Sequence, residues 1–356
     1  MFYNTHIHLF SDDDVPVDFL PFGLVKLIKI SVVNFIIKKV LRNLIPFTNK
    51  DKFHRYQKYI KTGLKGSQKK VFEACFASYP TDTKFIVLPM DMAYMSAGKV
   101  PRNYEDQIKE LEELKNTYPE NIVPFFHVDP RREGVLEMLK NAVEKQGFMG
   151  VKLYPPLGYF PYDERMNVIY DYCQEKNIPV IAHCSPCGSV HYSGKKETLE
   201  KMIREVNPNI DTKGKSVEDL CSMLTHPINY KTVMERFPNL RICAAHFGSD
   251  DQWERYLDKG YDINNWFVII KDMIQTYPNF YTDISYTLNK RKFFPLLKEI
   301  LEIKTVRNKV LFGSDYYMVE IESEEKRFGK ELRKYIGEEY FQSIAIDNPK
   351  KFLGLA

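Results

Sequence analysis

Short runs of β-branched and aromatic residues alternate along the chain with stretches of helical periodicity, and this alternation limits the fold more than any other feature. Strands that alternate with helices predict parallel strands joined by helical crossovers. Eight such units favour a closed (β/α)8 TIM barrel of the α/β class over an open sheet. The predicted strands are 2–10, 85–89, 122–128, 150–154, 180–182, 240–245, 280–284 and 310–312, and the predicted helices include 104–117, 134–146, 163–176, 230–237 and 265–276.

The whole chain, residues 1–356, is predicted to form a single barrel domain, since hydrophobic residues make up 44% of it and can supply a large core. Two helical insertions are expected after the first and fifth strands, at about 11–82 and 184–229. Because both follow strands, they belong on the C-terminal face, where barrel enzymes place their active sites. A helical tail from about residue 322 to residue 356 is expected to close the barrel.

The stretch 19–47 is rich in apolar residues but is interrupted by lysines, so it predicts an amphipathic helix or pair of helices rather than a membrane span. We expect it to pack on its own barrel or on a second subunit, and its apolar part, 24–45, is the candidate contact of a homodimer. A membrane-surface helix or a mobile lid is the alternative.

Charge and targeting signals exclude several classes of partner. The net charge is only +4, and no run of lysine and arginine exceeds a few residues, so nucleic acid is not an expected partner. The first residues lack the basic and apolar regions of a secretory signal. Six cysteines are scattered, and only Cys184 and Cys187 have Cys-x-x-Cys spacing, which predicts reduced thiols in a cytoplasmic protein.

Two histidines in the first predicted strand are the first sign of chemistry. His6 and His8 are separated by one residue, and a strand has a side-chain period of two, so both imidazoles should point into the barrel. Two imidazoles facing each other in a core are costly unless they bind a metal ion. Alone, this pattern is a weak signal.

Three later strands also stop at a metal-binding type of residue. The fifth ends in His183, the sixth in His246 and the eighth in Asp315, and in each case an apolar run stops at the polar residue. Since the carboxyl ends of barrel strands meet on one face, these side chains should gather there with His6 and His8. Together the five residues predict a metal-dependent enzyme.

These residues and the phrases around them resemble the amidohydrolase superfamily. The set His6-x-His8, His183, His246 and Asp315 is accompanied by GVKLYPPLG (150–158), PVIAHCSP, THPINYKTVMERFPNLRICAAHFG (225–248), VLFGSDY and DNPKKFLGL (347–355). The phrases resemble the amidohydrolase-related branch, which includes aminocarboxymuconate-semialdehyde and γ-resorcylate decarboxylases. The resemblance runs from the first strand to the last residues and is weakest in the insertion at 11–82.

The resemblance implies one divalent ion, of the zinc type, held by His6, His8, His183 and Asp315. Three neutral imidazoles and a carboxylate suit zinc and leave a position for water or substrate. His246 would act as general acid or base or would hold the oxyanion, and Asp315 would also accept a proton from the attacking water. Lys152 ends the fourth strand, where dinuclear relatives carry a carboxylated lysine between two ions; otherwise it would attract a substrate carboxylate.

The reaction stays open at this stage. The first expectation is a hydrolase in which metal-activated water attacks an amide, ester or lactone of a small molecule. The alternative is a lyase of the same fold, a decarboxylase or hydratase acting on a small carboxylated substrate. A phosphoesterase or nuclease and a non-catalytic barrel are weaker readings, since strand four lacks the glutamate of the former and no expected ligand is missing. Further residues that could contact a substrate, because they follow strands or sit in nearby loops, are Asp91, His127, Arg131, Tyr154, His191 and Ser285.

Overall fold

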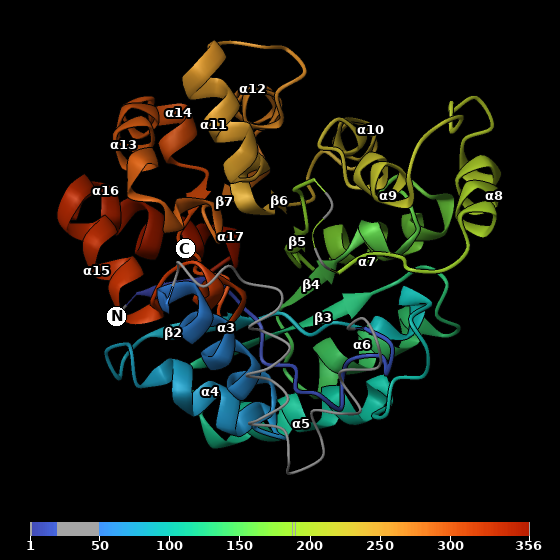
Figure 1. Cartoon of the computed structure of the whole chain (residues 1–356), viewed down its shortest axis with the longest axis horizontal. Helices are drawn as coiled ribbons and strands as arrows, with labels where there is room; N and C mark the ends of the chain where they lie inside the picture. Colours follow the sequence, from blue (N-terminus) through green and yellow to red (C-terminus); the bar gives the residue numbers. More distant parts are fainter. Residues whose placement is uncertain (1, 20–49, 187, 189, 356) are drawn as a thin grey trace.

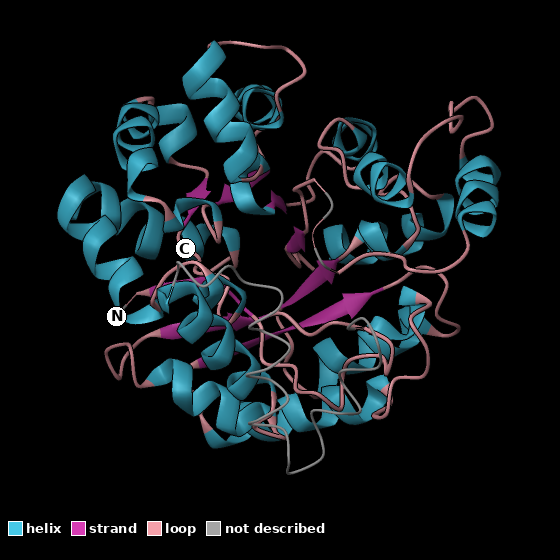
Figure 2. Cartoon of the chain, in the orientation of Figure 1, coloured by secondary structure: helices cyan, strands magenta, loops and turns pink. Residues whose placement is uncertain are grey.

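The computed structural model describes residues 2–19, 50–186, 188 and 190–355. Its eight strands form one sheet in the order β1 to β8, with every neighbouring pair parallel. Helices surround the strands (Figures 1 and 2). The predicted α/β barrel is therefore confirmed. The strands are β1 (Tyr3–Ile7), β2 (Lys84–Val87), β3 (Ile122–Val128), β4 (Gly150–Leu153), β5 (Val180–Ala182), β6 (Ile242–Ala244), β7 (Phe280–Asp283) and β8 (Val310–Leu311).

The helices lie between the strands as the periodicity predicts. Side chains cap several of them: Asn103 accepts from the third residue of α5, Asn265 caps α12, and Ser216 and Asp219 form a capping box on α9. The α-helices are α3 (Lys50–Gly63), α4 (Gln68–Phe76), α5 (Tyr104–Thr117), α6 (Val135–Lys145), α7 (Asn167–Glu175), α8 (Lys196–Val206), α9 (Val217–Leu224), α10 (Asn229–Arg236), α11 (Asp250–Lys259), α12 (Trp266–Thr276), α13 (Phe294–Glu302), α14 (Lys304–Arg307), α15 (Glu325–Ile336), α16 (Glu338–Gln342) and α17 (Asn348–Phe352).

The first strand is shorter than predicted. It ends at Ile7, whereas the apolar pattern extended it to residue 10. Leu9 and Phe10 are buried all the same, because they pack as a loop in the outer core. Their apolar character therefore reflects burial beneath the first insertion and not continued pairing in the sheet.

The two edges of the sheet meet and close the barrel. The Thr5 N–H donates to the Phe312 carbonyl at 2.8 Å, and the Asp315 N–H donates to the His6 carbonyl at 2.8 Å. Ile7 also forms a parallel bridge with Tyr316. We call this contact between β1 and the end of β8 the seam.

Alternation along the strands separates two apolar cores. Outward-facing residues such as Phe126, Val151 and Ala182 pack against the helices. Inward-facing residues such as Phe125 and Ile181 fill the barrel, and Phe352 and Leu353 from the end of the chain join this inner core. The tail therefore helps to close the barrel, as the sequence predicts.

The described parts of the insertions after β1 and β5 contain both helices and loops. The first contributes α3 and α4, and the second contributes α8 and α9, which enclose a small apolar core with Phe160 and Tyr192. The expected amphipathic helix at 19–47, with the dimer contact at 24–45, falls almost entirely on 20–49, outside the described residues. Among the helices that are described, none combines the length and the apolar character needed to cross a membrane.

Candidate active site

The inward-facing positions of the barrel change from apolar to ionisable near the carboxyl ends of the strands. Two residues beyond Phe125 and Ile181 of the inner apolar layer come His127 on β3 and His183 after β5. Lys152 on β4 and Asp283 on β7 also face inward near the ends of their strands. All four are buried. Because buried ionisable groups are costly, so many in one layer indicate a functional site.

His6, His8 and Asp315 bring three ligand atoms together at the seam. His6 Nε2 lies 3.3 Å from His8 Nε2, and Asp315 Oδ1 lies 3.6 Å and 3.4 Å from these two nitrogens. Ligands placed tetrahedrally about 2.1 Å from an ion are about 3.4 Å apart. The spacing of the three atoms therefore fits a single ion between them.

The partners of the two imidazoles show which of their nitrogens carry protons. His8 Nδ1 lies 2.8 Å from the Leu88 carbonyl, which can only accept, so Nδ1 is the donor. His6 Nδ1 lies 2.8 Å from the Asp283 carboxylate and donates in the same way. In the neutral rings both Nε2 atoms therefore carry lone pairs, and they face the Asp315 carboxylate oxygen. Three acceptors directed at one point need a cation.

Asp283 and Ser285 hold the rings from below. Asp283 accepts from His6 through Oδ2, and its Oδ1 accepts from the backbone N–H groups of His246 and Ser285, both at 3.0 Å. The Ser285 hydroxyl donates to Asp283 and lies 2.9 Å from His246 Nδ1. A carboxylate behind a ligating histidine is the usual support of a metal site.

The expected fourth ligand lies apart from these three in the described structure. His183 Nδ1 is 3.1 Å from His246 Nε2, and His183 Nε2 is 3.0 Å from the Ser185 hydroxyl. Neither group of described residues whose ligand atoms all lie within 4.8 Å, namely His6–His8–Asp315 and His6–His246–Asp283, includes His183. His183 would have to turn its ring to join the ion.

Burial and charge set the protonation of the site. Burial lowers the pKa of His6 to about 3, helped by the positive charge of Lys152 and opposed by Asp283. Burial raises the pKa of Asp315, but hydrogen bonding and the charges of the surrounding histidines outweigh it and leave the pKa below its ordinary value. The ring of His6 is thus neutral and Asp315 is ionised at neutral pH, which are the forms that bind a metal ion.

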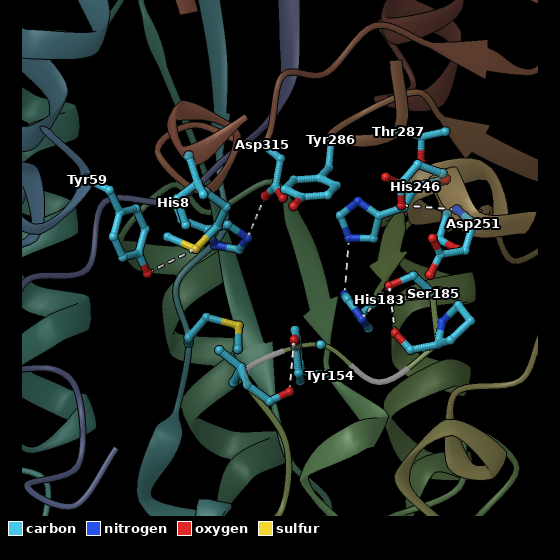
Figure 3. Close-up of a pocket in the computed structure, with 18 of the residues that line it drawn as sticks. His8, Tyr59, Tyr154, His183, Ser185, His246, Asp251, Tyr286, Thr287 and Asp315 are labelled. Atoms are coloured by element: carbon cyan, nitrogen blue, oxygen red, sulfur yellow. Dashed lines mark hydrogen bonds and ion pairs between the residues drawn. The ribbon is translucent and has the colours of Figure 1, made fainter. Parts of the chain in front are cut away.

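A cavity of about 300 Å³ opens above these residues (Figure 3). Its floor holds His8, His183, His246 and Asp315, and the side chains that Figure 3 labels converge on it from the ends of β1, β4, β5, β6, β7 and β8 and from α3 and α11. The walls include the aromatic residues Phe10, Tyr59, Tyr154 and Tyr286, with Met90 and Met318. This size and apolar wall suit a small molecule with a ring.

The further residues predicted to contact a substrate differ in where the structure places them. Tyr154 lines the cavity, and its ring centroid lies 4.4 Å from that of His183. Ser285 is buried under His6 and His246. Arg131 is held by Asp129 at 2.6 Å and 2.8 Å, and Asp91 pairs with Arg132 at 2.6 Å. His127 is buried within the barrel, and His191 contacts the Gly188 carbonyl at 2.8 Å.

Several cavity residues were not predicted. Tyr59 comes from α3 in the first insertion, which carries no recognisable motif. Asp250 and Asp251 line the cavity at the start of α11, four and five residues after His246, and Tyr286 follows Ser285. Asp250, Asp251 and Tyr286 lie a few residues after predicted strand ends, whereas nothing in the sequence marks Tyr59.

Strained backbone marks the same face of the barrel. His246, Phe247, Tyr286 and Asp315 have positive φ angles of 67°, 42°, 58° and 65°. Residues other than glycine rarely adopt such conformations, and they cluster at functional sites when the surrounding structure enforces them. Here the seam hydrogen bond from the Asp315 N–H to the His6 carbonyl helps to hold the turn.

Comparison with known proteins agrees with this architecture. A family model described as amidohydrolase matches residues 87–355. Among curated proteins, none matches the chain.

Solved structures resemble the chain over its whole length. One is a 5-carboxyvanillate decarboxylase from Novosphingobium aromaticivorans, solved with manganese and 4-hydroxy-3-methoxy-5-nitrobenzoic acid, with a TM-score of 0.59, 12% identity, and 100% of this chain and 96% of that chain covered. Another is a 2,6-dihydroxybenzoate decarboxylase from Rhizobium, with a TM-score of 0.53, 12% identity and coverage of 99% and 98%. A third is an uncharacterized TIM-barrel protein from Bordetella bronchiseptica, with a TM-score of 0.54, 16% identity and coverage of 99% and 98%.

At these identities the structural likeness shows the fold alone. The family assignment rests on the family model, which covers more than half of the chain. The chain belongs to the amidohydrolase superfamily.

Proposed function

We propose that this protein is a metal-dependent lyase that removes CO2 from a small carboxylated substrate. The observation that carries the proposal is the convergence of His6 Nε2, His8 Nε2 and Asp315 Oδ1, three acceptors at the floor of a cavity. The 5-carboxyvanillate and 2,6-dihydroxybenzoate decarboxylases of the same fold support decarboxylation rather than the hydrolysis expected first from the sequence.

The proposed ion is held by His6, His8 and Asp315, with His183 joining after its ring turns. Such an ion, when bound, binds and polarises an oxygen of the substrate. Zinc fits the donor set, and manganese is the ion of the 5-carboxyvanillate decarboxylase; the proposal is for one divalent ion of either kind.

One ion accounts for the contacts better than two. The second close group, His6, His246 and Asp283, is already explained by the hydrogen bond from His6 Nδ1 to Asp283 and by Ser285 bridging Asp283 and His246. In this one-ion proposal Lys152 is an ordinary, uncarboxylated lysine. The alternative is a two-ion site in which a carboxylated Lys152 lies between the ions.

His246 is proposed to handle the proton. Breaking the bond between the substrate and its carboxylate leaves an electron pair on carbon, which must take up a proton. Ser285 holds His246 Nδ1, so His246 Nε2 faces the cavity floor and His183. His246 is therefore placed to take a proton from the substrate and return it to that carbon.

Hydrolysis is the second candidate, because the same three acceptors would position a metal-bound water and the matching family is that of the amidohydrolases. One assay separates the two. The metal-loaded protein is offered hydroxybenzoates, and CO2 is measured; it is then offered aryl esters, amides and lactones, and acid is measured. CO2 release alone supports the lyase, and acid release alone overturns it.

The ligand assignment is tested separately. His183→Ala and Asp315→Ala should each lower the metal content measured by elemental analysis and abolish activity. Full metal occupancy in both variants would refute the assignment. A metal content near two per chain, lost on replacement of Lys152, would favour the dinuclear alternative.

Other parts of the proposal concern the whole protein. We propose that residues 1–356 form one domain and that the partner is a small molecule, with a homodimer through 24–45 as a further proposal. A cytoplasmic location is supported by the five described cysteines, which are all free thiols.

A further inference from the structure

One stretch of the first insertion is strongly basic. Residues 20–70 hold 13 of the 51 Lys and Arg residues of the chain, but only one of its 47 Asp and Glu residues, Asp51. The net charge of +4 therefore combines a basic segment with an acidic remainder of the chain. Charge of one sign that is collected in one place attracts partners of the opposite charge.

The described part of this stretch gathers four lysines where two helices meet. α3 ends at Gly63 and α4 begins at Gln68, and Gly66, with a φ angle of 71°, turns the chain between them. The two helices pack against each other and are the labelled blue helices of Figure 1. The lysines of this turn, which we call the lysine corner, are Lys61, Lys65, Lys69 and Lys70.

The lysine corner faces solvent without acids that compensate its charge. Three of its side chains are exposed, and Lys65 is half-buried. None of the four forms an ion pair with a carboxylate of the described residues. Lysines on other helices have such partners one turn away, as Lys140 has in Glu137 and Lys196 has in Glu200. The positive charge of the corner is therefore available to an external anion.

Two of these lysines lie where they oppose the stability of their own helix. Lys69 and Lys70 are in the first turn of α4, which contains no acidic residue. The N-terminus of a helix carries a partial positive charge, so acids stabilise it and cations destabilise it. Helix stability therefore does not explain these two lysines, whereas a negatively charged partner does.

Apolar side chains lie beside the lysine corner. Ile60 and Leu64, each next in the sequence to one of its lysines, line a hollow of about 70 Å³ together with Phe19 and Tyr317, among others. Lysines next to apolar surface suit the boundary of a lipid bilayer, where the charges meet headgroup phosphates and the apolar groups leave water. A nucleic acid would neutralise the charges and leave the apolar surface in water.

The sequence before α3 has the same composition. Residues 20–49 contain five Lys or Arg residues, no Asp or Glu, and 17 hydrophobic residues. Basic and apolar residues without acids are typical of segments that bind anionic membranes. Eleven of the 13 cations in 20–70 are lysines, which act as point charges toward a diffuse surface, whereas arginine favours bidentate recognition of a single phosphate.

We propose that the lysine corner binds the surface of an anionic lipid bilayer and attaches the protein to it without a membrane span. The cytoplasmic leaflet of membranes carries such lipids, which agrees with the proposed location. Tyr59 of α3 lines the cavity of the candidate active site, so the bilayer would lie against the insertion that forms one wall of that cavity. The inference depends neither on the metal ion nor on the reaction.

The test is flotation of the full chain with lipid vesicles. One set contains phosphatidylcholine alone, and the other contains phosphatidylcholine with about one third phosphatidylserine. At about 0.1 M salt we expect binding to the anionic vesicles to be roughly tenfold or more tighter than binding to the neutral ones. Raising the salt to about 1 M should release the protein, because the screening length falls from about 10 Å to about 3 Å. Equal binding to both sets, or binding to neither, would overturn the inference.

The test variant combines Lys61→Gln, Lys65→Gln, Lys69→Gln and Lys70→Gln. It should bind the anionic vesicles roughly 100-fold or more weakly, because each lysine near a charged membrane contributes about fivefold to the affinity. None of the four residues lines the cavity, so the metal content and the melting temperature should match those of the natural chain. Undiminished vesicle binding by this variant would show that the lysine corner is not the site.

The matched control removes the same number of positive charges from exposed lysines elsewhere on the surface. Its substitutions are Lys213→Gln, Lys259→Gln, Lys298→Gln and Lys304→Gln. We expect its vesicle binding to change by less than about threefold, because these lysines lie outside the basic segment. Equal losses in the test variant and the control would mean that overall charge, and not the lysine corner, is responsible, and would refute the proposal.

Nucleic acid is the competing partner. A short fluorescent RNA oligonucleotide is titrated into the protein at the same salt and at the same phosphate concentration as the anionic vesicles. We expect weaker binding to the RNA than to the vesicles. Tighter binding to the RNA that is lost in the test variant would assign the lysine corner to a nucleic acid and overturn the membrane inference.

Discussion

Replacement of Asp283 by Asn is predicted to weaken metal binding without removing any metal ligand. Asp283 Oδ1 accepts two backbone N–H groups and the Ser285 hydroxyl, while Oδ2 accepts the N–H of His6 Nδ1. The Asn oxygen can replace only one carboxylate oxygen. With three donors around Oδ1, the new amide group will face His6 Nδ1 and present a donor to a donor.

His6 must then move its proton to Nε2, the atom that faces His8 and Asp315. The lone pair that would bind the ion is lost, or the unfavourable contact persists. Removal of a supporting carboxylate behind a ligating histidine typically costs about 10- to 100-fold in metal affinity, which corresponds to about 1.4 to 2.8 kcal/mol. We expect the zinc dissociation constant of Asp283→Asn to rise by that factor.

The assay is competition for zinc between the protein and a chromophoric chelator, performed on the metal-free natural chain and on Asp283→Asn below their melting temperatures. Asp251→Asn is the control, because Asp251 is exposed at the cavity rim and should shift the constant by less than about threefold. An unchanged constant in Asp283→Asn would refute the assignment of the His6 proton and its connection to the ion.

Three further predictions concern stability. Burial raises the pKa of Glu325 from its ordinary value to about 7. Between the ordinary pKa and this raised pKa, the folded protein holds a proton that the unfolded chain has released. The free energy of unfolding therefore falls by roughly 3 kcal/mol as the pH rises from below the ordinary pKa to above the raised one. Glu325→Gln should therefore melt higher than the natural chain at pH 8 and show little gain at pH 4.5, whereas the exposed Glu324→Gln should show neither effect. Gly150→Ala would place a Cβ 2.2 Å from the Phe125 ring inside the barrel. The free energy of unfolding, measured by chemical denaturation, should fall by about 1–3 kcal/mol. Gly188→Ala is the control, because Gly188 has open space around it and the substitution should change this free energy little. Removal of the ion by a chelator should lower the melting temperature. An ion concentration 100 times its dissociation constant should restore about 2.7 kcal/mol of the free energy of unfolding. An identical melting temperature with and without the ion would count against the site.

The barrel and the general position of the site could be predicted because both depend on periodic patterns. Strand periodicity located all eight strands, with errors only at their ends, and it placed His6 and His8 on the inner face. The seam then brings Asp315 to them, which follows once eight parallel strands close. The resemblance to the superfamily implies the same residues.

What escaped prediction depends on contacts that no pattern encodes. The two ring nitrogens of His183 contact His246, which follows β6, and Ser185, two residues further along the chain, and no periodicity predicts how a ring is turned. Arg131 was a candidate for a substrate carboxylate, yet Asp129, two residues away, binds its guanidinium. Tyr59 reaches the cavity from an insertion whose course no periodicity could give.

The seam of the barrel has a consequence for how the site comes into being. His6 and His8 belong to the first strand and Asp315 to the last, so more than 300 residues of chain separate the proposed ligands. Joining the ends of so long a loop carries an entropic cost that only the folded barrel offsets. The proposed ion would therefore bind last and would fasten the two ends of the chain together, and any substitution that loosens the seam should weaken metal binding from a distance, even where it touches no ligand.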